Sequence, residues 1–119
     1  MDQSQEIESA LNRTADDLLA DIGQQLLPTS VAPRSREQAI QIAKNWIDKK
    51  RSTWAQHICE NEKVQEIRKM TQSRERQILL VAAVADVIAS IVVGVGPVTA
   101  AALLVREGLE TLCGSPNPQ

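Results

Sequence analysis

The chain has 119 residues, which is the length of a single domain, and a formal net charge of −2. The chain contains two tryptophans, Trp46 and Trp54, and no Phe or Tyr. This composition argues against nucleic-acid or sugar binding by aromatic stacking. Residues 1–33 carry six acidic side chains and one basic one, whereas residues 34–76 carry 11 basic and six acidic ones. This asymmetry predicts that the acidic part lies against the basic part, or that the basic part faces an anionic partner.

The first residues, MDQSQEIES, contain neither a basic start nor an apolar stretch, so we predict no cleavable secretory signal. The chain is therefore expected to begin in the cytoplasm, with Cys59 and Cys113 as reduced thiols. His57 and Cys59 are two residues apart and point to different faces of a helix, and no Cys-x-x-Cys pair is present. We predict no metal site, no cofactor and no catalysis, because no nucleophile with an orienting base can be named.

Residues 1–27 predict an acidic amphipathic helix, in which apolar residues recur at helical spacing between positions 3 and 27. These residues are Ile7, Leu11, Leu18, Ile22 and Leu26. Gly23 weakens the expected last turn of this helix. Pro28 and Pro33 cannot both lie inside one helix, so residues 28–34 predict a linker.

Residues 35–77 predict a basic helical segment without Gly or Pro. Ser35 and Gln38 have the spacing of a capping box that begins a helix. Clusters of backbone-bonding residues predict breaks near Glu60-Asn61 and near Thr71–Ser73. We predict that seven basic side chains of this segment contact an anionic surface, which is either lipid or an acidic protein. The alternative is that these side chains are simply solvated. They are Lys49, Lys50, Arg51, Arg68, Lys69, Arg74 and Arg76.

Residues 78–112 predict an apolar helical hairpin, and residues 113–119 predict a disordered tail. The turn contains Gly94, Gly96 and Pro97, and Pro97 suits the first position of the second helix. Small side chains and one acid recur every four residues and form a narrow face, which we predict to be the helix-packing or insertion face. Its residues are Ala82, Asp86, Ser90 and Gly94.

The apolar block 78–105 belongs either in a bilayer or in a protein core. On the insertion scale, the 11 Leu, Ile and Val residues between Ile78 and Gly96 contribute on the order of −5 kcal/mol, and Asp86 offsets about 3 kcal/mol of this. A membrane span is therefore marginal and requires an oligomer that pairs or hydrates Asp86. In the core alternative, the helix over 3–27 and the segment 36–60 cover the block, and Asp86 either needs a buried partner, such as a basic residue of the middle segment, or lies at an edge.

The sequence Gly94-Val95-Gly96-Pro97-Val98-Thr99-Ala100 resembles the turn of the helix-hairpin-helix family, which binds the DNA backbone. The resemblance lies in the glycine-hydrophobic-glycine core and the small residues after it, and it implies that backbone amides at the start of a helix hold a phosphate. Val98 stands where a basic residue often lies, and the preceding helix has no basic residue after Arg76. Attraction to phosphate is then poor, so nucleic acid is not the expected partner.

These observations predict an all-α, bundle-like protein of about four helices that is not an enzyme. The first hypothesis is a small protein at the cytoplasmic side of a membrane, because basic residues precede the apolar block. Its hairpin would insert into the membrane or self-assemble, and the protein would act as an anchor, an assembly factor or a membrane-perturbing element. Its partner would be a second copy of the chain, another helical protein or anionic lipid. The alternative is a soluble cytoplasmic interaction or adaptor module with the hairpin as its core, and the second alternative is a DNA-backbone binder.

Overall fold

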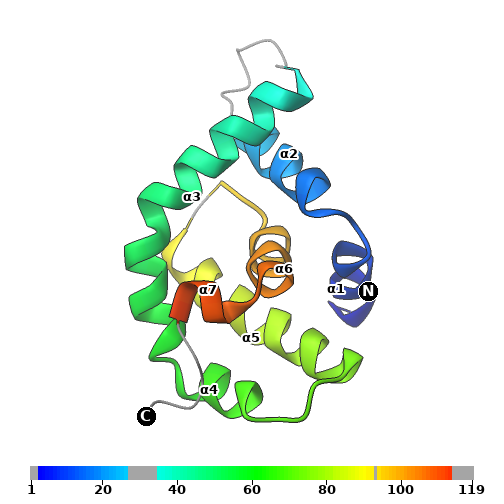
Figure 1. Ribbon diagram of the computed structural model, residues 1–119, viewed down its shortest axis with the longest axis vertical. Helices are drawn as coiled ribbons and strands as arrows, with labels where there is room; N and C mark the ends of the chain where they lie inside the picture. Colours follow the sequence, from blue (N-terminus) through cyan, green and yellow to red (C-terminus); the bar gives the residue numbers. More distant parts are fainter. Residues whose placement is uncertain (1–2, 27–34, 93, 114–119) are drawn as a thin grey trace.

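The computed structural model describes residues 3–26, 35–92 and 94–113, and these residues form helices and turns without a strand (Figure 1). The predicted all-α fold is confirmed, although the described residues form seven helices instead of about four. In chain order they are α1 (Gln3–Leu11), α2 (Ala15–Gln25), α3 (Arg36–Cys59), α4 (Glu62–Arg68), α5 (Arg74–Ile91), α6 (Pro97–Glu107) and α7 (Leu109–Cys113). Side-chain caps and one glycine divide the predicted segments into these shorter helices.

The helix predicted over residues 3–27 is two helices, because Thr14 begins a second one. Its side-chain oxygen accepts a hydrogen bond of 3.1 Å from the backbone N–H of Asp17, which satisfies a donor that a helix start otherwise leaves free. Arg13 lies in the turn and forms an ion pair of 2.9 Å with Asp21. The acidic segment therefore folds as α1 and α2, and the linker predicted at residues 28–34 lies outside the described residues.

The helix starts and breaks predicted in the basic segment are confirmed. Ser35 and Gln38 form a reciprocal capping box, with both backbone-to-side-chain hydrogen bonds at 3.2 Å. Asn61 accepts a 3.0 Å bond from the backbone N–H of Val64 at the start of α4, and Ser73 accepts one of 3.0 Å from Arg76 N–H at the start of α5. Short polar side chains thus end one helix and begin the next, as their competition with backbone hydrogen bonds predicts.

The predicted hairpin is formed by α5 and α6, with Pro97 as the first residue of α6. Gly94 has a φ of 97°, a conformation that strongly favours glycine. The backbone N–H of Gly96 donates a 2.6 Å hydrogen bond to Gln25 Oε1, which ties the turn to the end of α2. The second arm was predicted to continue to residue 112, but Gly108 adopts a φ of 92° and separates α6 from α7.

The centre of the core is α6, which contacts α1, α2, α5 and α7 (Figure 1). Most of its side chains are buried, and they are Val98, Ala100, Ala101, Ala102, Leu103, Leu104 and Val105. Within the described residues, no helix is both long and apolar enough to cross a membrane. The second arm of the apolar block 78–105 is enclosed by the other helices of the same chain.

At Gly23, α2 and α3 approach each other closely. A Cβ atom at this position would lie 2.8 Å from Ala39 Cα and closer still to the Ala39 carbonyl group. Both residues are buried, so neither backbone can move aside into solvent. The sequence predicted only a weakened last turn at Gly23. The structure shows that the contact between the two helices requires a residue without a side chain at this position.

One pair of charges joins the acidic and basic parts of the chain, as their asymmetry predicted. The Arg36 guanidinium lies 2.8 Å from Asp17 Oδ1, between α3 and α2. The hydrogen bond from Arg36, with a smaller contribution from Thr14, holds the pKa of Asp17 below its ordinary value of 3.8. The side chains of Arg36 and Asp17 are 57% and 38% exposed, so solvent screens this pair, which adds little stability but helps to orient α2 on α3.

Cys59 and Cys113 form a disulfide bond, which corrects the expectation of two reduced thiols. Their Cα atoms are 5.5 Å apart, within the ordinary range for such a bond. The bond joins the end of α3 to the end of α7 across 54 residues of sequence. That proximity depends on α7 turning back after Gly108, which the helical periodicity of the sequence does not reveal.

Candidate functional site

The face predicted to pack or insert lies on the outside of α5. Ala82 is half-buried, whereas Asp86, Ser90 and Gly94 are exposed. The Ser90 hydroxyl donates a 2.7 Å hydrogen bond to the backbone carbonyl of Val87 in its own helix. Of the two positions predicted for Asp86 in a protein core, the structure therefore shows the edge, where the side chain is exposed and needs no buried partner.

The opposite side of α5 makes the helix contacts within the bundle. Leu80, Val81, Val84 and Ile88 are almost completely buried there. These side chains are large, so the bundle interior uses the bulky side of α5 and leaves the small-residue face outside. Alanines lie on both sides of this helix, and the single acid on the outer side does not by itself determine which side is covered.

The seven cations predicted to contact an anionic surface do not form one surface. Lys49 and Lys50 on α3 and Lys69 after α4 are exposed. Arg51 lies 3.6 Å from Asp48 on the same helix. Arg74 is exposed and donates a 2.7 Å hydrogen bond to Asn12 Oδ1.

The remaining two cations, Arg68 and Arg76, are buried, with 8% and 7% of their surface exposed. Arg76 donates 3.1 Å hydrogen bonds to Gln72 Oε1 and to the backbone carbonyl of Arg68. The predicted anionic-surface set therefore divides into five side chains that reach solvent, on α3, after α4 and at the start of α5, and two arginines inside the protein. A sequence pattern cannot show that two cations so close to the apolar block are covered.

The helix α3 carries a net positive charge and runs along one side of the molecule (Figure 1). Five of its residues are basic and two are acidic. Arg36 and Arg51 have acidic partners, whereas Lys44, Lys49 and Lys50 form no ion pair with the described residues. Trp46 is half-buried and packs edge-on against the buried Trp54, with ring centroids 5.2 Å apart.

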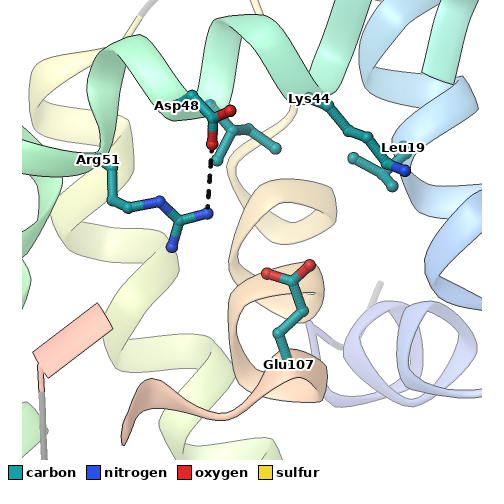
Figure 2. A pocket seen from close by; sticks show the side chains of 6 residues that line it. Leu19, Lys44, Asp48, Arg51 and Glu107 are labelled. Atoms are coloured by element: carbon teal, nitrogen blue, oxygen red, sulfur yellow. Dashed lines mark ion pairs between the residues drawn. The ribbon is translucent and has the colours of Figure 1, made fainter. Parts of the chain in front are cut away.

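A pocket lies between α2, α3 and α6, and Lys44 of α3 is one of its lining residues. Its volume is about 200 Å³. Figure 2 shows Lys44, Asp48 and Arg51 on α3 and Glu107 on α6 around this pocket. Buried Leu19 and Ile47 also line it, so charged side chains surround an apolar interior.

We name this pocket the α3–α6 pocket, and sequence reasoning did not find it. Lys44, Asp48 and Arg51 have the i, i+4, i+7 spacing that places residues on one helix face. This spacing is the feature of the sequence that could have indicated the pocket. Nothing in the sequence places Glu107 or Leu19 beside them, because these residues come from distant segments. The site exists only through the packing of α2 and α6 on α3.

The lining of the α3–α6 pocket is mixed. It contains two cations, two carboxylates and two apolar side chains. Among the described residues, no three His, Cys, Asp or Glu side chains lie close enough to hold a metal ion. An apolar interior with a charged rim can hold one apolar side chain of a partner while the rim pairs with its charged neighbours.

No protein-family model, no curated protein and no solved structure matches this chain.

Proposed function

We propose that this protein is a non-enzymatic helical interaction module that binds an acidic segment of another protein at the α3–α6 pocket. The observation that carries the proposal is the pocket itself, in which charged residues surround buried Leu19 and Ile47. An apolar side chain of the partner would enter this space and exclude water from it. The burial of α6 in the bundle supports this proposal over hairpin insertion, because insertion would expose that core.

The charge of α3 favours an acidic partner. With five basic residues against two acidic ones, the helix attracts carboxylates at long range and accelerates association. Lys44 lines the pocket and forms no ion pair with the described residues, so its ammonium group is available to a bound carboxylate. A partner segment with one Leu between acidic residues matches both the apolar interior and this charge.

A titration with a synthetic peptide tests the proposal. The probe is a capped Glu-Glu-Leu-Glu-Glu peptide added to the purified full chain at low salt, and amide chemical shifts are followed by NMR. We expect saturable shifts centred on Leu19, Lys44 and Ile47, with a Kd on the order of 0.1–1 mM, which corresponds to about −4 to −5.5 kcal/mol. Replacing the peptide's Leu by Ala should weaken binding several-fold, because an apolar contact is removed.

Two charge reversals provide the matched comparison. Lys44→Glu changes the pocket rim, and Lys63→Glu makes the same charge change at an exposed position of α4. We expect Lys44→Glu to weaken binding at least fivefold and Lys63→Glu less than twofold. Equal losses, or equal binding of a Lys-Lys-Leu-Lys-Lys peptide, would reject the pocket as the site. Insertion of the protein into phosphatidylserine vesicles, detected as co-flotation at high salt, would favour the membrane hypothesis and overturn the proposal.

A further inference from the structure

A second cavity, of about 200 Å³, lies where the turn before α5 meets the junction of α6 and α7. Its polar lining residues are Gln72, Arg76 and Gln77, and its apolar ones are Leu80, Val105 and Leu109. It is smaller than the roughly 300–1,000 Å³ pockets that hold drug-sized ligands. A small molecule of a few carbon atoms is the size of occupant that it admits.

Arg76 is the charged residue of this cavity and is 93% buried, since 7% of its surface is exposed. A guanidinium has five N–H donors. Nη1 donates to Gln72 Oε1 and Nη2 to the Arg68 carbonyl, both at 3.1 Å, and the buried Nε has no hydrogen-bond partner among the described residues. Arg76 therefore brings a full positive charge to the cavity, and Nη1 and Nη2 each keep one N–H beyond these two bonds.

The acceptors that the structure gives to Arg76 are neutral. The Arg68 carbonyl lies at the end of α4, where the helix supplies only a partial negative charge, and the described lining of the cavity contains no carboxylate. Burying a cation without an anion is costly, and buried charges in proteins are normally paired. An anion in this cavity would provide the missing counter-charge.

We propose that this cavity binds a small organic carboxylate with a short hydrocarbon chain, and that Arg76 is its anion-binding group. The planar guanidinium matches a carboxylate, Gln72 and Gln77 offer amide donors, and Leu80, Val105 and Leu109 receive the hydrocarbon part. A bound carboxylate would contact α5 and the α6–α7 junction at once. It would therefore stabilise the position of α7, which ends at the disulfide-bonded Cys113.

The probe is 2-methylpropanoate, and the control ligand is its neutral amide, 2-methylpropanamide. Both are titrated into the full-length, disulfide-bonded protein while amide shifts are recorded by NMR. The carboxylate should give saturable shifts at Gln77, Leu80, Gly108 and Leu109 with a Kd of about 1 mM, a value suited to so few ligand atoms. The amide should give no saturable shift, because it lacks the charge that Arg76 requires.

Three variants separate binding from folding. Arg76→Gln should weaken carboxylate binding at least tenfold, and Lys69→Gln, which removes an exposed positive charge after α4, should leave it unchanged. If Arg76→Gln does not fold, Gln77→Glu decides the matter. Gln77 Oε1 accepts a 3.4 Å bond from Arg74 that glutamate can also accept, and the new carboxylate should fill the anion role and abolish binding. Unchanged affinity in Gln77→Glu, equal binding of the amide, or shifts centred elsewhere would overturn the proposal.

Discussion

The substitution Gly23→Ala separates two physical effects of opposite sign. Gly23 lies inside α2, where alanine is favoured over glycine by about 1 kcal/mol in helix propensity. A Cβ atom at this position, however, would overlap the Ala39 backbone of α3. Overpacking costs about 1–3 kcal/mol and occasionally more, and the upper end applies because the obstacle is a buried backbone. We therefore expect a net loss of about 2 kcal/mol in the free energy of unfolding.

Urea unfolding followed by circular dichroism measures this loss, and thermal unfolding should show a decrease in Tm of about 8 °C at about 4 °C per kcal/mol. Gly96→Ala is the matched control, since its Cβ atom would meet the Thr99 hydroxyl at 3.5 Å and Gln25 at 3.7 Å or more, which are ordinary contacts. Gly96 is an N-cap residue with a φ of −61°, so alanine should cost less than about 1 kcal/mol there. A Gly23→Ala protein as stable as the parent would refute the close approach of α2 and α3.

Two further predictions concern the disulfide and the charge pair. The Cys59–Cys113 bond spans 54 residues, and for a loop of this length the chain-entropy model gives a stabilisation of about 4 kcal/mol. The double substitution Cys59→Ser and Cys113→Ser should therefore lower the free energy of unfolding, measured in urea, by about that amount. Two titratable thiols in the unreduced parent protein would contradict the bond. Arg36 lowers the pKa of Asp17 in the folded protein. The stabilising contribution of Asp17 to folding is therefore fully present at pH values above its ordinary pKa of 3.8, and it disappears as the pH falls through the lower pKa of the folded state. The difference in urea midpoint between the parent and Asp17→Asn should therefore vanish in acid, and a difference that persists at pH 2 would exclude the charge pair as its cause.

The helix boundaries that depend on local chemistry could be predicted from the sequence. Ser35 with Gln38, the polar cluster at Glu60-Asn61 and Pro97 each act through their own backbone neighbourhood, and the structure has helix ends at all three. Thr14 is a cap of the same kind, but apolar residues on both sides continue the helical spacing across it. The helical periodicity of the apolar residues therefore predicted one continuous helix, whereas the side-chain hydrogen bond of Thr14 ends α1 and begins α2.

The features that depend on packing could not be predicted. Asp86 in an apolar block left three positions open, in a membrane assembly, in a buried ion pair or at an edge, and the structure has it on the outer face of α5. The α3–α6 pocket and the Arg76 cavity both combine residues from distant segments. Helical spacing determines which residues share a face of one helix, whereas it does not determine which other helix covers that face.

The central position of α6 has a consequence for the order of folding. The N-terminal helices α1 and α2 both pack on α6, and the Arg106 side chain at its end donates a 2.8 Å hydrogen bond to the Leu11 carbonyl, 95 residues earlier. A ribosome releases α1 and α2 long before it has made α6, so their contacts with this helix form only when the hairpin emerges. Contacts between such distant segments form slowly, and we expect α2 to pair with α3 and α5 with α6 before α1 and α2 contact α6. The interval before docking is when the nascent chain is most exposed to aggregation and to proteases.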